Sequence, residues 1–161
     1  MTSNFNTSVT DLSKDEWLTP PDIVRSLGDF DLDPCAPVKR PWDTAKFHYT
    51  VEDNGLLKPW HGRVWLNPPY GRETFKWLER LAAHGSGVAL IFARTETQGF
   101  RKAIWDKAYS VFFFTGRLSF YHVTEKKDGA TNAPSCLVTY SPKDALALDS
   151  AGFNGKHIVL R

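Results

Sequence analysis

The sequence predicts an α/β domain built on a mainly parallel sheet. Residues 87–93 (GVALIFA) and 110–115 (SVFFFT) are almost continuous apolar runs, which is typical of strands in a parallel sheet that is covered on both faces. Segments with helical spacing alternate with the predicted strands. The 161 residues are the length of one domain, so we expect residues 1–161 to fold as a single unit.

Composition narrows the setting in which this domain works. The net charge of +2 is too small to indicate a nucleic-acid partner by itself, so any basic surface must come from local clustering. No apolar run reaches the ~20 residues of a membrane-spanning helix, and the N-terminus carries no secretory signal. Cys35 and Cys136 lack metal-ligand spacing, and the five His form no metal motif. We therefore expect a cytoplasmic protein with reduced thiols and no metal.

Proline and glycine residues mark the ends of the predicted elements in the first third of the chain. Residues 1–14 are polar and predict a flexible arm. A short helix is predicted over residues 22–27, because a proline pair precedes it and a glycine follows it. Residues 30–36 (FDLDPCA) predict a strand that ends in a proline turn. A short strand at residues 47–51 then leads into a turn at residues 53–55.

The most informative stretch is residues 64–71 (VWLNPPYG). Its apolar start predicts the end of a buried strand, and the proline pair stops that strand because each ring fixes φ and removes a backbone donor. The result is a rigid loop that presents Asn67, Pro68 and Tyr70. It lies at the carboxyl end of a strand, which is where open α/β sheets bind ligands.

The predicted elements of the second half are helices over 73–84 and 100–108 and strands over 87–93, 110–115, 135–140 and 157–160. Residues 116–120 are predicted to continue the strand 110–115 past a break. Only a polar loop, residues 122–134, separates the strands 110–115 and 135–140, so these two could pair antiparallel.

The loop at residues 67–70 suits an amino group on a ring or an amide. The Asn67 side-chain oxygen and the Pro68 carbonyl are both acceptors, and two acceptors on one NH2 group draw the nitrogen lone pair out of conjugation. Tyr70 offers a flat face on which a planar group can stack. We therefore interpret Asn67, Pro68, Pro69 and Tyr70 as catalytic residues that hold an amine for attack on an electrophile.

Asn67-Pro68-Pro69-Tyr70 resembles the Asn/Asp-Pro-Pro-Tyr signature of S-adenosylmethionine-dependent amino-methyltransferases. The surrounding series is similar to that of the phage-type, Dam-like DNA N-6-adenine methyltransferases: Trp17-Leu18-Thr19-Pro20, Asp31-Leu32-Asp33-Pro34-Cys35-Ala36, Asp53-Asn54-Gly55-Leu56 and Trp60. The resemblance implies a single Rossmann-like methyltransferase domain, with an antiparallel strand near its C-terminus at the edge of the sheet, that methylates adenine in DNA. It also implies S-adenosylmethionine as the cofactor and a phage or prophage protein in a bacterial cytoplasm.

The same resemblance implies a set of cofactor-binding residues: Trp17, Thr19, Pro20, Asp33, Pro34, Cys35, Ala36 and Asp53. It places the first three beside the methionine part, Asp33 at the ammonium, with Asp31 as second choice, and Asp53 near the adenosine. Plain structural alternatives are a proline-started helix, a turn-capping Asp33 and an Asx turn at Asp53. The chain also departs from the wider methyltransferase pattern, because residues 34–37 (PCAP) replace a Gly-rich loop.

Four basic residues are the predicted contacts to double-stranded, single-stranded or locally opened DNA: Arg94, Arg117, Lys126 and Lys127. The two arginines follow buried strands at the same sheet edge as Asn67, although a salt bridge or a plain surface charge also explains them. No insertion is large enough to form a separate recognition region, so we expect short or lax sequence specificity. Flipping a base out of a duplex costs a few kcal/mol, which favours opened DNA for so small a protein.

Two other interpretations remain open from the sequence. The same signature fits an amine of RNA adenine, cytosine or protein glutamine. A non-catalytic nucleic-acid-binding domain of methyltransferase fold is the second alternative: the replaced Gly-rich loop supports it, and the intact Asn67–Tyr70 signature argues against it.

Overall fold

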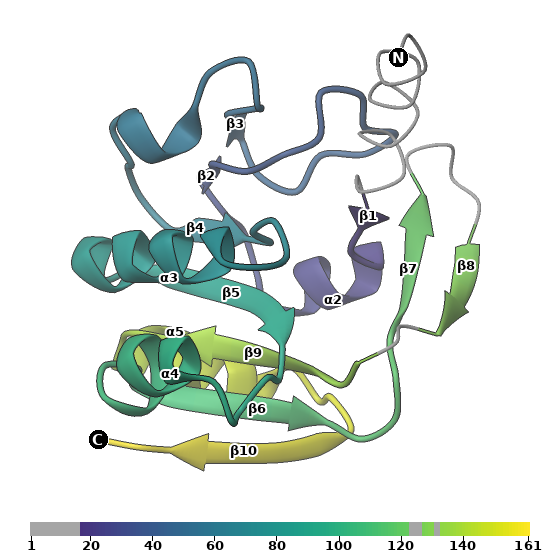
Figure 1. Cartoon of the computed structure of the whole chain (residues 1–161). Coiled ribbons are helices and arrows are strands. Elements are labelled where there is room, and N and C mark those ends of the chain that lie inside the picture. The colour runs from purple at the N-terminus through teal and green to yellow at the C-terminus, as the bar shows by residue number, and fades with distance from the viewer. Residues whose placement is uncertain (1–16, 123–126, 131–132) are drawn as a thin grey trace, which may run out of the picture.

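A computed structural model describes residues 17–122, 127–130 and 133–161. Its main feature is a seven-stranded sheet with the strand order β10-β6-β9-β5-β4-β2-β3 (Figure 1). These strands are β2 (Leu32–Asp33), β3 (Phe47–His48), β4 (Val64–Leu66), β5 (Gly87–Phe92), β6 (Ser110–Phe114), β9 (Ser135–Thr139) and β10 (Gly155–Val159). The predicted arm at residues 1–14 and Lys126 lie outside the described residues.

Strands β3, β2, β4, β5 and β6 run in one direction, and β9 and β10 run in the opposite direction. Strands β3, β2, β4 and β5 pair parallel to one another, whereas β9 pairs antiparallel with both β5 and β6, and β10 pairs antiparallel with β6. The predicted antiparallel pairing of residues 110–115 with 135–140 is therefore confirmed. Its predicted place is wrong, because β9 is inserted between β5 and β6 and the edge belongs to β10.

Helices cover both faces of this sheet. On one face lie α3 (Glu73–His84), α4 (Gln98–Phe100) and the π-helical turn η2 (Arg101–Trp105); on the other lie α2 (Pro21–Ser26) and α5 (Pro142–Ser150). The strand side chains alternate between the two cores: Val64 and Leu66 pack on the α3 side, and Trp65 on the α2 side. The mixed α/β class predicted from the buried runs is confirmed.

A second sheet of three short strands stands beside the main one, with the order β1-β7-β8 (Figure 1). Its members are β1 (Trp17–Leu18), β7 (Ser119–His122) and β8 (Lys127–Ala130). The prediction that residues 116–120 continue the strand 110–115 is wrong. Gly116 takes a positive φ of 81°, which ends β6 and sends the chain into the small sheet.

Element boundaries agree where the chain carries clear stop signals. Helix α3 has the predicted bounds, and Gly85 ends it in the left-handed conformation. The predicted strand at residues 47–51 shrinks to Phe47–His48, and η1 (Gly55–Leu57) and α5 were not predicted. No helix among the described residues is long and apolar enough to cross a membrane.

A buried ion pair fastens the amino ends of β4 and β5 to α5. Arg63 Nε donates to Asp144 Oδ1 at 2.8 Å, and Asp144 Oδ2 accepts from the backbone N–H of Gly87 at 2.8 Å. Arg63 also donates to the carbonyl of Leu27 at 2.6 Å. Asp144 is 1% exposed, so its charge depends on these partners.

We expect Asp144→Ala to lower the free energy of unfolding by about 3–5 kcal/mol, because it leaves the Arg63 guanidinium without its buried partner. The measurement is urea denaturation followed by circular dichroism. Asp22→Ala removes a carboxylate that is 92% exposed and 3.9 Å from Arg25, and it should cost less than about 1 kcal/mol. Equal losses in the two variants would contradict the role given to Asp144.

Candidate active site

Strand register gathers the candidate site at one edge of the sheet. Leu32 lies opposite Val64 in β2 and β4, and Leu66 lies opposite Ala89 in β4 and β5. All three strands run in the same direction, so their carboxyl ends meet. The two proline turns, at Asp33-Pro34 and at Asn67-Pro68-Pro69, therefore end neighbouring strands.

A cavity of about 500 Å³ opens between these turns, and it is large enough for a cofactor. Nine of the predicted site residues line it: Thr19, Asp33, Pro34, Cys35, Ala36, Asn67, Pro68, Pro69 and Tyr70. The other lining residues are Leu18, Pro37, Thr44, Thr50, Val51, Asn54, Gly55, Trp65 and Trp77. The structure thus brings the predicted catalytic residues and most of the predicted cofactor residues together.

The Asn67 amide is oriented by a buried hydroxyl. Its Nδ2 donates to Thr19 Oγ1 at 3.3 Å, and Thr19 is only 2% exposed. Because the amide nitrogen is engaged there, the Oδ1 atom is the part of Asn67 that remains to accept a hydrogen bond. Thr19 therefore belongs to the positioning of Asn67, a role that the sequence did not indicate.

The loop after Asn67 is anchored to the start of α3. The Thr74 hydroxyl donates to the Pro69 carbonyl, and the Thr74 backbone N–H donates to the Gly71 carbonyl at 3.3 Å. Gly71 has a φ of +95°, which lets the chain turn from the proline pair into the helix. Two proline rings and these anchors make the loop a fixed platform.

Tyr70 uses one face of its ring for the protein. It stacks on Phe92 with 4.3 Å between ring centroids and 5° between planes, while the residue remains 42% exposed. Phe92 ends β5, so this contact ties the platform to the neighbouring strand. Burial raises the pKa of Tyr70 to about 12, so its hydroxyl is neutral at physiological pH. The second ring face is left for a planar ligand.

Asp33 is the buried charge of the cavity. Its Oδ1 accepts from the Cys35 backbone N–H at 3.1 Å, its Oδ2 accepts from the Thr44 hydroxyl, and the residue is 3% exposed. Burial raises the pKa of Asp33 to about 6, against the smaller opposing effects of these hydrogen bonds and of Arg40. A carboxylate on the wall of a largely apolar cavity suits a cationic group of a ligand.

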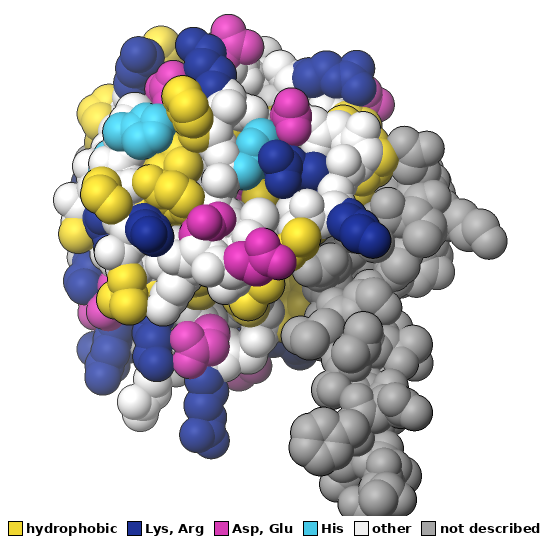
Figure 2. All heavy atoms as spheres, turned by 90° about the horizontal axis from the view of Figure 1, so that it is seen from above, with side chains coloured by type: hydrophobic (Ala, Val, Ile, Leu, Met, Phe, Trp, Pro, Cys, Tyr) yellow, Lys and Arg dark blue, Asp and Glu magenta, His cyan; other side chains and the backbone are white. Residues whose placement is uncertain are grey.

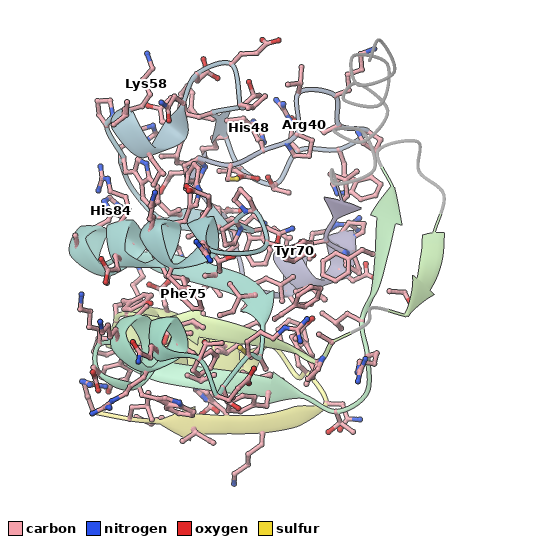
Figure 3. All side chains as sticks on the ribbon, in the orientation of Figure 1. Arg40, His48, Lys58, Tyr70, Phe75 and His84 are labelled. Atoms are coloured by element: carbon pink, nitrogen blue, oxygen red, sulfur yellow. The ribbon has the colours of Figure 1, made fainter. Side chains whose placement is uncertain are left out.

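The connection at residues 37–46 closes over Asp33. The Thr44 backbone N–H donates to His48 Nε2 at 3.3 Å, and Arg40 donates to the Pro37 carbonyl at 3.2 Å (Figure 3). Burial, assisted by Arg40, lowers the pKa of His48, which favours the neutral ring that accepts this bond. Residues of this connection are therefore held in place beside the carboxylate.

Comparison with known families finds one match, which covers most of the chain. The sequence model of the family described as DNA N-6-adenine-methyltransferase (Dam) matches residues 6–150. The chain belongs to the Dam family. Membership implies DNA adenine N6-methyltransferase activity, and every residue that lines the cavity falls within the matched range. Neither the search of curated proteins nor the search of solved structures finds a match.

Two of the cofactor residues predicted for this Dam-family protein, Pro20 and Asp53, are not among the described residues that line the cavity, and Trp17 lies outside this test. Pro20 precedes the first turn of α2, and Trp17 lies in β1, where its side chain is not described. Asp53 is exposed, and its Oδ2 accepts from the Thr50 backbone N–H at 2.8 Å, as in the loop-shaping alternative. The loop instead turns Thr50, Val51 and Asn54 toward the cavity.

Gly55, in the same loop, allows the backbone to pack closely against the turn at residues 34–37, which itself contains no glycine. A Cβ on Gly55 would lie 2.0 Å from the Pro34 carbonyl oxygen, so only glycine fits against that turn. Trp60 Nε1 donates to the Gly55 carbonyl at 2.8 Å, and the Trp60 ring stacks near Trp77, which lines the cavity. The signal for this contact was the Asn54-Gly55 pair, which predicts a turn and belongs to the series that resembles the Dam-like methyltransferases.

The predicted DNA-contacting residues are spread over several segments. Arg94 follows β5 and lines a second cavity beside Tyr70. Arg117 is exposed between β6 and β7. Lys127 begins β8, with its side chain outside the description. Their contacts with DNA stay a prediction.

We expect Thr19→Val to slow methylation of adenine in DNA about 5- to 10-fold, because the loss of one hydrogen bond of ~1 kcal/mol lets the Asn67 amide rotate. Single-turnover kinetics provide the measurement. Thr19→Ser keeps the hydroxyl and should stay close to the wild-type rate. A valine variant as fast as the serine variant would show that Thr19 does not orient Asn67.

Proposed function

We propose that this protein is an S-adenosylmethionine-dependent enzyme of Rossmann-like methyltransferase fold that methylates the exocyclic amine of adenine in DNA. One observation carries the proposal. The Asn67 amide, oriented by Thr19, and the buried carboxylate of Asp33 share a single cavity of about 500 Å³. An acceptor for an amine and an anion for an ammonium are the two groups that this reaction needs at opposite ends of one site.

The residues present fit the cofactor. Asp33 would take its ammonium, and the turn at Pro34–Pro37 with Thr44 would enclose the methionine part. The loop that contains Thr50, Val51 and Asn54 would lie along the adenosine. When bound, S-adenosylmethionine supplies an electrophilic methyl group on a sulfonium.

The protein's part in the reaction is to hold the amine. Asn67 Oδ1 and the Pro68 carbonyl would accept its two hydrogens, so the lone pair leaves the ring system and points at the electrophile. The open face of Tyr70 would carry the adenine ring, and the Phe92 stack keeps Tyr70 from turning. The largely apolar walls would exclude water, which strengthens both hydrogen bonds.

DNA contact is proposed to be weakly dependent on sequence. Near the cavity, the described residues provide the connection 37–46 and the small sheet as additional surface. The face above β3 and η1 mixes Lys and Arg with acidic and hydrophobic side chains, the last including Phe47, Val51 and Leu57 (Figure 2). This face lacks a strong field of one sign. Because no insertion is large enough to form a separate recognition region and flipping a base out of a duplex is costly, we propose lax specificity and a preference for opened or single-stranded DNA.

The proposed role of Asn67 in holding the amine is tested by Asn67→Ala. Loss of one preorganised polar contact at a reacting centre typically lowers kcat by ~10²–10³-fold, and we expect that loss here with cofactor affinity retained. The measurements are single-turnover methylation of a DNA oligonucleotide and calorimetric titration of the cofactor. Asn154→Ala, an exposed asparagine ahead of β10, is the matched control and should be unchanged. A wild-type kcat in Asn67→Ala would contradict the role of Asn67 in holding the amine.

The proposed ammonium site at Asp33 is tested by measuring cofactor affinity at different pH values. The Asp33 carboxyl has a pKa of about 6 in the free protein, so it is ionised at pH 8 and mostly protonated at pH 5. Affinity for S-adenosylmethionine should therefore fall by about 10-fold over that range, by proton linkage. The fold should lose no stability from this group as pH falls from 7 to 5, since burial favours its neutral form.

Calorimetric titrations at several pH values provide the measurement. Asp33→Asn should bind more weakly at pH 8 and should remove most of the pH dependence. An affinity in Asp33→Asn that equals the wild type at pH 8 would move the ammonium site to another group.

A further inference from the structure

A second cavity, of about 540 Å³, adjoins the first along Pro68 and Tyr70. Its remaining lining residues are Gly71, Arg72, Thr74, Phe75, Ile91, Phe92, Arg94 and Thr97. The cavity lies between the start of α3, the end of β5 and the loop before α4. Because the two cavities share Tyr70, a ligand in the second cavity would lie next to the proposed target base, with only Tyr70 between them.

The walls of this second cavity are apolar and rigid. Phe75, Ile91 and Phe92 supply them, and Phe75 extends from α3 toward α4 (Figure 3). The Phe75 ring packs directly on the backbone of Gly99, where an added Cβ would come within 2.3 Å of a ring carbon. Fixed aromatic walls favour a planar, aromatic occupant.

The rim of the second cavity is positively charged. Arg72 and Arg94 are both exposed, and neither pairs with a carboxylate among the residues that the structure describes. The Arg94 guanidinium lies over the Phe92 ring, 5.8 Å from its centroid, so it is held at the rim of the cavity. The Thr97 hydroxyl is already committed, because it donates to the Arg94 carbonyl at 2.8 Å and accepts from the Phe100 backbone N–H at 3.2 Å. The polar groups left for a ligand are guanidinium groups, which bind phosphate.

We infer that this cavity holds the nucleotide next to the target adenine in the same strand, with its base against Phe75 and the edge of Phe92 and its phosphate at Arg94. The inference rests on the proposed function and names a substrate subsite for it. Three features carry it: the shared Tyr70, the aromatic walls and the arginine rim. Stacking accepts any base, so the subsite fixes the strand beside the target without demanding a strict motif.

Photocrosslinking tests where the neighbouring nucleotide lies. Single-stranded oligonucleotides with one adenine carry 5-iodouracil one or two positions to either side of it, and they are irradiated with the protein and S-adenosylhomocysteine. We expect a crosslink to Phe75 or Phe92, identified by mass spectrometry, from one adjacent position and not from the positions two removed. Crosslinks to these rings from every position alike, or from none, would overturn the inference.

Binding measurements supply the second arm. Replacing the base of the crosslinking neighbour by an abasic site should weaken wild-type binding about 5- to 150-fold, the usual worth of one base–aromatic stack. Phe75→Ala should lose most of this difference. Arg94→Gln should weaken binding of both oligonucleotides, and Arg25→Gln, an exposed arginine on α2, should behave as wild type. A Phe75→Ala or Arg94→Gln variant indistinguishable from Arg25→Gln would overturn the inference.

These results separate the two proposals. A protein that methylates adenine in DNA but shows neither the crosslink nor the abasic effect keeps the proposed function and loses the subsite. A protein that methylates no DNA loses the proposed function, whatever its crosslinks show.

Discussion

The register between β2, β4 and β5 is the constraint on which the site depends. Leu32 opposite Val64, together with Val64 opposite Gly87, places the carboxyl ends of three parallel strands side by side. A shift of one residue in either pairing would turn the buried side chains to the wrong face, so the two hydrophobic cores hold the register. Given that register, Asp33 and Asn67 come to one cavity, and the proline after each stops its strand there.

The amino ends of the strands carry a stabilising ion pair, and the carboxyl ends carry the candidate site. At the amino ends, the buried Arg63–Asp144 pair joins β4, β5 and α5. At the carboxyl ends, Asp33 lies buried with a raised pKa and Tyr70 remains partly exposed. A buried carboxylate and an exposed aromatic ring are unfavourable for an unliganded protein, and such groups cluster where a ligand compensates them.

The features that the sequence predicted correctly depend on signals between residues close together in the chain. The bounds of α3 follow from its apolar stripe and Gly85, and the Asn67–Tyr70 loop follows from two prolines, because these effects act over a few residues. The inserted position of β9 and the turn of residues 116–120 into a second sheet depend on contacts between distant segments. For the same reason, the hydrogen bond from Asn67 to Thr19, 48 residues away, and the stack of Tyr70 on Phe92 were not predicted.

In the proposed reaction, one cavity brings a cofactor's methyl group to an adenine amine held by Asn67. The most direct measurement is mass spectrometry of nucleosides and protein after incubation of wild-type protein with S-adenosylmethionine that carries a trideuterated methyl group and with DNA, RNA and protein substrates. The account predicts trideuterated N6-methyladenine in the DNA, at a higher rate for single-stranded than for duplex oligonucleotides. Label found only in RNA, in cytosine or in glutamine, or found in no substrate, would contradict it.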